Sequence, residues 1–123
     1  MKLNDDVVQI LKKYEKMLYF VDYPENGLYK RYYSNGKLRE KTNFKNGRPD
    51  GYCEWYYKNG QLNRKGNYIN GYEDGLHVWY HKNGQLASRR NYKNGKWDGL
   101  SEWFNEEGKL HMKENYKNGR EVK

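Results

Sequence analysis

Four glycines lie 24 residues apart in this chain, at Gly27, Gly51, Gly75 and Gly99. Each begins a copy of one pattern, in which aromatic residues, a first Asn-Gly, a leucine, an Asn-aromatic pair and a second Asn-Gly follow in order, with isolated departures. A repeat of this length is one supersecondary unit that cannot bury its apolar side chains alone, so neighbouring copies must stack. The sequence therefore predicts a repeat array whose function lies on an extended surface.

The repeats divide the 123 residues into an array and a preceding segment of residues 1–26. The four copies span residues 27–50, 51–74, 75–98 and 99–123. In the first segment, apolar side chains recur at helical spacing behind Asn4, a residue suited to cap a helix. They are Val7, Ile10, Leu11, Tyr14, Met17 and Leu18. We expect a short α-helix that caps the array, followed by residues 19–23 extended along the first hairpin; the alternative is a partner-binding or dimer-forming helix.

Two Asn-Gly pairs in each copy indicate turns. The first lies between two segments suited to strands, at residues 35–36, 59–60 and 83–84, and Glu107-Gly108 takes its place in the last copy. Asn-Gly favours a two-residue type I′ hairpin turn, because both positions of that turn need a positive φ. We expect such turns here, with the last hairpin the weakest. The second pair, at residues 46–47, 70–71, 94–95 and 118–119, is expected to form the longer connection between hairpins.

The predicted fold is therefore mostly β, an antiparallel β-hairpin repeat solenoid with two strands in each repeat. A two-residue turn would pair the fifth, sixth and seventh positions of a repeat with the fourteenth, thirteenth and twelfth. The face expected to be packed then holds Trp55, Trp79 and Trp103, with Leu38, Leu62, Leu86 and Leu110, and with Phe44, Tyr68, Tyr92 and Tyr116. Arg31 replaces tryptophan in the first copy, as an atypical end repeat allows.

The opposite face carries an aromatic row beside a cationic row. The aromatic residues are Tyr32, Tyr56, Tyr80 and Phe104, and the cations are Lys41, Lys65, Arg89 and Lys113. Tyrosine and arginine contribute much of the binding energy in protein interfaces, and rings held on strands lose little entropy on binding. We expect these eight side chains to form the partner-binding site.

Charge indicates what such a face would bind. The chain has a net charge of +8, and the repeats carry all of the excess because residues 1–26 are net −1. A basic surface favours anionic partners such as nucleic acid, phospholipid or an acidic protein face, although lysines beside turns also keep exposed strands soluble. The single cysteine, Cys53, excludes an internal disulfide, and no stretch resembles a secretion signal or a membrane span. We expect a cytoplasmic protein.

Catalytic and metal-binding clusters are not predicted. Asp50, Asp74 and Asp98 precede glycines one repeat apart, about 10 Å, which is too wide for an acid–base pair, so we expect them to cap turns. His77 and His81 would lie about 13 Å apart on a strand, out of reach of one metal ion. We therefore expect no enzymatic activity, no metal and no cofactor.

The run Gly-x-x-x-Trp-Tyr-Tyr-x-Asn-Gly-x-Leu, continued by Asn-Tyr-x-Asn-Gly-x-x-Asp-Gly, resembles the MORN repeat. It is most similar to the bacterial variant found in proteins labelled as YwqK-family antitoxins, and the resemblance covers residues 27–119. The resemblance implies a β-hairpin solenoid that acts as a binding module without enzymatic activity, with a role in toxin neutralisation or immunity.

Three functions remain open at this point. The first is a protein-binding antitoxin or phage-encoded inhibitor that covers the functional surface of a toxin or defence enzyme. The second is direct nucleic-acid or nucleotide binding, in which rings stack on bases while cations follow the phosphates. The third, association with an anionic membrane surface, is the least favoured, because no helix has a basic polar face. A homodimer through the last edge strand or the N-terminal helix is a further possibility.

Overall fold

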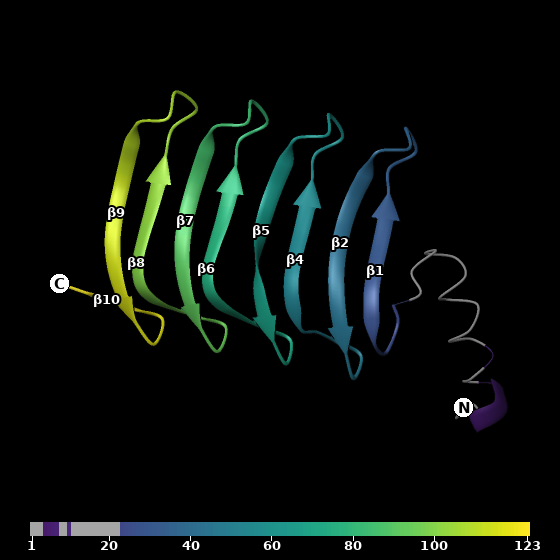
Figure 1. Cartoon of the computed structure of the whole chain (residues 1–123). Coiled ribbons are helices and arrows are strands. Elements are labelled where there is room, and N and C mark those ends of the chain that lie inside the picture. Colours follow the sequence, from purple (N-terminus) through teal and green to yellow (C-terminus); the bar gives the residue numbers. More distant parts are fainter. Residues whose placement is uncertain (1–3, 8–9, 11–22) are drawn as a thin grey trace.

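The array is a single antiparallel β-sheet, and no second layer covers it within the residues that the structure describes (Figure 1). The structure is a computed structural model that describes residues 4–7, 10 and 23–123. The strands lie side by side in the order β1-β2-β4-β5-β6-β7-β8-β9-β10, and β3 pairs with β2. Their bounds are β1 Gly27–Tyr32, β2 Leu38–Lys45, β3 Arg48–Pro49, β4 Gly51–Tyr56, β5 Leu62–Ile69, β6 Tyr72–Tyr80, β7 Leu86–Lys93, β8 Lys96–Phe104, β9 Leu110–Lys117 and β10 Arg120–Val122. This arrangement confirms the predicted antiparallel hairpin-repeat fold.

The second Asn-Gly pair of each repeat forms the tight turn of the sheet. In the second repeat, Asn70 has a φ of 50° and Gly71 a φ of 86°. The residues on either side, Ile69 and Tyr72, pair directly across the ladder, so only two residues lie in the turn. Positive φ at both positions is what a type I′ turn requires, and Asn and Gly adopt it at the lowest steric cost. The expectation of a longer connection here was wrong.

The first Asn-Gly pair lies in the wider loop. Gly60 has a φ of 90°, but Asn59 does not have a positive φ. The Gly60 N–H donates to the Tyr57 carbonyl at 3.0 Å, and the Tyr57 N–H donates to the Gln61 carbonyl at 2.9 Å. A β-turn followed by a left-handed glycine is typical of a hairpin loop longer than two residues. The predicted type I′ turn was therefore wrong, and Glu107, which has no positive φ, gives no reason for a weak last hairpin.

The wider loop also changes the register beside it. The fifth and fourteenth positions pair as predicted, for example Trp55 with Arg64. Beyond them a bulge brings Leu62 opposite Tyr56, and the same shift recurs in the other three hairpins. The extra residue of the bulge belongs to the returning strand. The predicted pairing of the sixth and seventh positions was therefore wrong, and the leucines pair with the aromatic row of Tyr56 instead.

Side chains of each repeat bind the backbone of the next at the loop end of the sheet. The Tyr57 hydroxyl donates to the Tyr80 carbonyl at 2.7 Å, and Asn59 Nδ2 donates to the Lys82 carbonyl at 3.0 Å. Equivalent bonds are made one repeat earlier by Tyr33 and Asn35, and one repeat later by His81 and Asn83. These bonds set the spacing of neighbouring hairpins.

Carboxylates hold the tight turns at the other end of the strands. Asp50 Oδ2 accepts a hydrogen bond from the Asn70 N–H at 3.0 Å, and Asp98 Oδ2 accepts one from the Asn118 N–H at 3.3 Å. These contacts confirm the predicted turn-capping role for Asp50 and Asp98, whereas the Asp74 carboxylate makes no such bond within the described residues.

One face of the sheet buries more side chain than the other, and we call it the Trp face. It is defined by Trp55, Trp79, Trp97 and Trp103. The ring centroid of Trp55 lies 6.0 Å from that of Tyr68, and the centroid of Trp79 lies 6.3 Å from that of Tyr92. These contacts confirm that the tryptophan row packs with the tyrosines of the returning strands. The most buried side chains on this face include Cys53, His77 and Ser101.

Two arginines fill the spaces between the tryptophans. The Arg64 guanidinium carbon lies 5.1 Å from the Trp55 ring and 4.6 Å from the Trp79 ring. The Arg90 guanidinium carbon lies 4.3 Å from the Trp79 ring and 5.5 Å from the Trp103 ring. The result is one continuous Trp-Arg-Trp-Arg-Trp stack that crosses three repeats. Cation–π contacts of this kind contribute roughly 0.5–2 kcal/mol each.

The described part of residues 1–26 begins a short helix. Residues 5–7 and 10 are helical, and the Val7 N–H donates to Asn4 Oδ1 at 2.9 Å, which is the predicted N-cap. The Tyr23 ring lies 5.3 Å from that of Tyr29 and 5.4 Å from that of Phe44, so this segment ends against the first hairpin. The remainder of the predicted helix and of the extended segment, including Leu11, Tyr14, Met17, Leu18 and residues 19–22, lies outside the described residues.

Replacing asparagine by glycine should have a different effect on stability in the two kinds of turn. Asn70→Gly should change the free energy of unfolding by less than about 0.5 kcal/mol, because glycine adopts the required positive φ. Asn59→Gly should cost about 1–2 kcal/mol, because Asn59 Oδ1 accepts from the Gln61 N–H at 2.9 Å and Nδ2 donates to Lys82. Denaturant unfolding of both variants checks this. An equal cost for the two would contradict the assignment of the turns.

Candidate functional site

The second face of the sheet carries the predicted rings and cations, and we call it the Tyr–Lys face. It is defined by Tyr32, Tyr56, Tyr80, Phe104, Lys41, Lys65, Arg89 and Lys113. The structure brings Lys65 Nζ to 5.8 Å from the Tyr80 ring centroid and the Arg89 guanidinium carbon to 5.4 Å from the Phe104 ring centroid. Each of these cations therefore lies over the ring of the following repeat. Within the described residues, Lys41 and Lys113 do not make such a contact with a ring of this face.

A row of paired residues crosses the Tyr–Lys face from β1 to β9. Lys41 pairs with Lys30 on one side and with Glu54 on the other, and Lys113 pairs with Glu102. The complete row is Lys30, Lys41, Glu54, Lys65, Val78, Arg89, Glu102 and Lys113. Five cations and two carboxylates give this row an excess of positive charge. The sequence already indicated that Glu54 and Glu102 interrupt the cations, but it did not single out Val78.

Val78 is the apolar centre of this row. Its relative exposure is 7%, and it pairs with Lys65 in β5 and with Arg89 in β7. Long cationic side chains cover apolar neighbours with their methylene stems while the charged ends stay in water. Because Val78 is already buried in the chain alone, it packs beneath the two cations and leaves their charged ends and the rings as the parts a partner can reach. The sequence signal for this residue is its place at the fourth position of the repeat, because the predicted register, continued by one residue, pairs that position with the fifteenth.

The hydroxyls of Tyr52 and Tyr56 stay neutral. Partial burial, together with the nearby Glu54 carboxylate, raises the pKa of Tyr56 to about 12. The same two causes raise the pKa of Tyr52, whose hydroxyl donates to Glu54 Oε2 at 3.4 Å. Tyr32, Tyr52 and Tyr72 are the exposed rings on this side of the sheet, with 56%, 47% and 57% of their surface accessible. These rings can therefore offer apolar area and hydrogen-bond donors to a partner.

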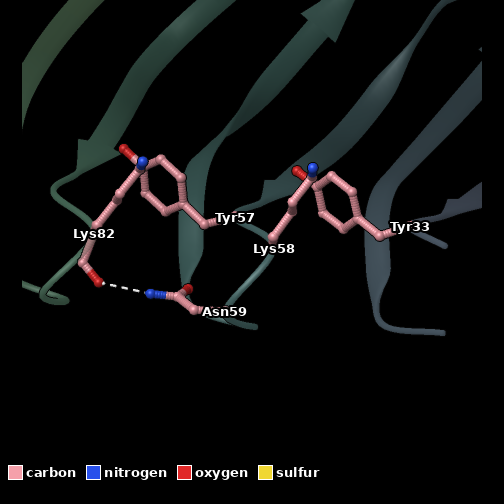
Figure 2. Close-up of a pocket in the computed structure, with 5 residues that line it drawn as sticks. All are labelled: Tyr33, Tyr57, Lys58, Asn59 and Lys82. Carbon is pink, nitrogen blue, oxygen red and sulfur yellow. Dashed lines mark hydrogen bonds between the residues drawn. The ribbon is translucent and has the colours of Figure 1, made fainter. Parts of the chain in front are cut away.

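The wider loops form a pocket of about 310 Å³ that is lined by Tyr33, Tyr57, Lys58, Asn59 and Lys82. Figure 2 shows Lys58 beside the Tyr33 ring and Lys82 beside the Tyr57 ring. Lys82 Nζ lies 6.0 Å from the Tyr57 ring centroid. Both tyrosine hydroxyls donate to carbonyls of the next repeat, and so does the Asn59 amide. The pocket is thus built from the contacts that join the repeats.

The groups capable of catalysis serve the scaffold instead. Cys53 is fully buried, its Sγ donates to the Gly51 carbonyl at 3.6 Å, and burial raises the pKa of the thiol. A thiol held in its neutral form is a poor nucleophile. No three His, Cys, Asp or Glu side chains among the described residues form a metal-binding group. The described segments also contain no helix that is long and apolar enough to cross a membrane.

His77 is fully buried on the Trp face, where both ring nitrogens have partners. Nε2 lies 2.7 Å from the Asn67 carbonyl, and Nδ1 lies 3.3 Å from an Arg64 guanidinium nitrogen. A carbonyl only accepts and a guanidinium only donates, so Nε2 carries the proton and Nδ1 accepts. Burial lowers the pKa of His77, and the Arg64 charge lowers it further. The imidazole is therefore a neutral link between two strands.

The buried His77 predicts a loss of stability in mild acid. Its pKa is lower in the folded state than in the unfolded chain, where it is about 6.5, so the folded state binds fewer protons. The stabilisation is present above pH ~6.5 and is lost as the pH falls from there toward the folded-state pKa. The charged groups around the ring are Arg64, Glu73 and Asp74. Denaturant unfolding between pH 7 and 5 should show this slope, and His77→Gln should remove it.

The matched control is His111→Gln, because His111 is exposed on β9. That variant should keep the slope of the parent protein. If His77→Gln keeps it as well, then other groups cause the acid sensitivity.

Gly66 makes room for the His77 ring. A Cβ atom added at Gly66 would lie 2.2 Å from His77 Nδ1, closer than real atoms approach. Gly66→Ala should therefore cost about 1–3 kcal/mol through overpacking. His77→Cys should relieve most of that cost in the double variant, because Cys53 is the equivalent residue one repeat earlier and fits beside Thr42. Unfolding of the two single variants and the double variant checks this; additive losses would contradict the steric explanation.

Stacked hairpins with a ring-and-cation face define a repeat scaffold that presents an extended surface. The MORN repeat variant matches this chain four times, at residues 25–46, 49–70, 73–94 and 97–118, and the chain belongs to this family. Each match begins two residues before one of the periodic glycines. The Gly71 N–H donates to the Pro49 carbonyl and the Gly119 N–H to the Trp97 carbonyl, so each bond joins the first residue of a matched stretch to the residue just after its end. No curated protein matches the chain.

Proposed function

We propose that this protein is a non-enzymatic binding module that neutralises a partner protein in the cytoplasm by covering its functional surface. The partner would be a bacterial toxin or a defence enzyme such as a nuclease, so the protein would be an antitoxin of the YwqK type or a phage-encoded inhibitor. Modules built from MORN repeats are generally protein-binding scaffolds and are typically non-catalytic, which supports the coarser part of this proposal.

The observation that carries the proposal is the ladder of cations and rings on the Tyr–Lys face. Lys65 lies over Tyr80 and Arg89 over Phe104, so the ladder continues from one repeat to the next. Rigid rings give contact area at little entropic cost, and the cations steer the approach of an acidic surface. We therefore expect an acidic protein surface as the partner.

Direct nucleic-acid binding is less favoured by the same geometry. Arg89 forms an ion pair with Glu102 at 2.9 Å, and Glu54 lies between Lys41 and Lys65 in the row. A polyphosphate backbone would pass close to both carboxylates. A protein surface can instead offer neutral or basic residues at those two points.

The test is affinity capture by the tagged protein from cells of its source, with and without nuclease, followed by washes at about 50 and 200 mM salt. The binding variant combines Tyr56→Ala, Tyr80→Ala, Lys65→Gln and Arg89→Gln. We expect the unchanged protein to retain one protein through nuclease and salt, and the variant to lose it while keeping its melting temperature. The purified partner should then lose its activity when the protein is added.

A matched control keeps the charge loss but moves it away from the face. Lys58→Gln and Lys82→Gln remove two cations from the wider loops at the edge of the sheet. This control should still retain the partner. Recovery of nucleic acid alone, lost with nuclease or salt, would overturn the proposal in favour of direct nucleic-acid binding. Equal loss of the partner from the binding variant and from the control would exclude the Tyr–Lys face as its binding site.

A further inference from the structure

The Trp face holds two arginines that have no acidic partner within the described part of the chain. In the first repeat, Arg31 lies 3.1 Å from the Glu40 carboxylate on the same face. Arg64 and Arg90 have no such ion pair among the described residues. Arg64 donates to the Tyr68 hydroxyl at 3.0 Å and contacts His77, whereas Arg90 makes no hydrogen bond there. Two cations in the middle of this face therefore lack the counter-charge that the first repeat provides.

The tryptophans orient these cations for a carboxylate. Rings lie on both sides of Arg64, and three rings, those of Trp79, Trp97 and Trp103, lie within 5.6 Å of the Arg90 guanidinium carbon. A guanidinium covered on its flat sides can donate only from its edge, and the edge is the part that binds a carboxylate with two parallel hydrogen bonds. Ser101, which pairs with Arg90, is fully buried, and its Oγ has no hydrogen-bond partner in the described chain.

The face is also open. The described residues form one sheet, and no described element lies over either side of it (Figure 1). Arg64, Arg90 and the tryptophans around them are each only half-buried. A partner can therefore reach the outer edge of both guanidinium groups without unfolding any described part of the protein.

We propose that the Trp face binds an extended acidic segment of another protein, with one carboxylate at Arg64 and a second at Arg90. The two arginines stand on β5 and β7, one repeat apart and two residues offset along the strands. Strand spacing and rise place their backbones about 12 Å apart. Two acidic residues four positions apart on one side of an extended segment span about 13 Å. This site lies opposite the Tyr–Lys face and is independent of the function proposed for that face.

The carboxylates on the Trp face favour a peptide over nucleic acid. Glu73 pairs with Tyr68 next to the Arg64 site, and Glu114 Oε2 accepts a hydrogen bond from the Tyr116 hydroxyl at 2.6 Å. A continuous phosphate backbone would meet both negative charges. An extended peptide alternates its side chains and can place neutral residues beside them. The Arg31–Glu40 pair shows that this face already accommodates a carboxylate against an arginine.

Tryptophan fluorescence reads out this site specifically. All four tryptophans of the chain belong to the Trp face, and the Tyr–Lys face has none. The probe is a short blocked peptide of serine and threonine in which two glutamates stand four residues apart. Its matched control has glutamine at both positions, and a second control places the glutamates two residues apart. We expect a saturable change in emission with the first peptide, and affinities weaker by about tenfold or more for both controls.

Variants of the protein locate the binding. Arg90→Gln should weaken binding of the acidic peptide by about tenfold or more, and Arg90→Lys should also weaken it, because lysine keeps the charge but not the planar edge. Lys65→Gln combined with Arg89→Gln removes two cations from the opposite face and should leave the affinity unchanged. Arg90→Lys keeps the test decisive if Arg90→Gln unfolds, and circular dichroism shows which variants fold.

Three results would overturn the proposal. Equal affinity for the acidic and glutamine peptides would show that the arginine edges do not bind carboxylates. Loss of binding with the Lys65 and Arg89 variant, but not with the Arg90 variants, would move the acidic site to the Tyr–Lys face. Stronger competition by a single-stranded oligonucleotide than by the acidic peptide would assign the Trp face to nucleic acid. Each of these leaves the capture experiment on the Tyr–Lys face unaffected, so the two proposals fail separately.

Discussion

The stacking of arginine between tryptophan rings takes the place of the second layer that a β-sheet normally packs against. A sheet hydrophobic on one face is usually stable only when another element covers that face. Here Arg64 bridges the tryptophans of the second and third repeats, and Arg90 bridges those of the third and fourth. The tryptophan rings and the arginine side chains thus cover one another along the length of the array. A single repeat cannot cover its own tryptophan ring, so the stack needs neighbouring hairpins.

The order of strands could be read from the periodic glycines and the Asn-Gly pairs, but the kind of turn could not. Both pairs are the same dipeptide, and Asn-Gly is compatible with either loop. The wider loop is closed by its own main-chain bonds, and the last repeat forms the same loop and the same bulge although no described hairpin follows it. The bonds from Tyr57 and Asn59 to the Tyr80 and Lys82 carbonyls therefore join the repeats but do not cause the loop. The preferences of the dipeptide alone do not distinguish the two loops, and the displaced leucine register follows from the wider one.

In the candidate site, too, the repeat pattern predicts the periodic residues, whereas burial and non-periodic contacts depend on packing. The cationic row of the Tyr–Lys face follows from the fifteenth position of each repeat, which the predicted register placed correctly. Its buried apolar residue, Val78, could not be recognised from composition, since only the register places it between Lys65 and Arg89. On the Trp face, Arg64 and Arg90 occupy different positions of their repeats, the fourteenth and the sixteenth. Their joint stack is therefore not periodic, and a search for periodic rows misses it.

The edge of the sheet beside β9 differs from the edges at which neighbouring repeats meet. The last repeat replaces the three residues that reach the next hairpin, with Asn105 in place of tyrosine, Glu107 in place of asparagine and Val122 in place of aspartate. Asn105 Oδ1 instead accepts hydrogen bonds from the N–H groups of Glu107 and Lys109 within its own loop. A strand added beside β9 would gain main-chain hydrogen bonds but none of these side-chain bonds to carbonyls and turns. Neighbouring repeats are joined by both kinds of bond, so a strand added at this edge would make fewer contacts than one repeat makes with the next.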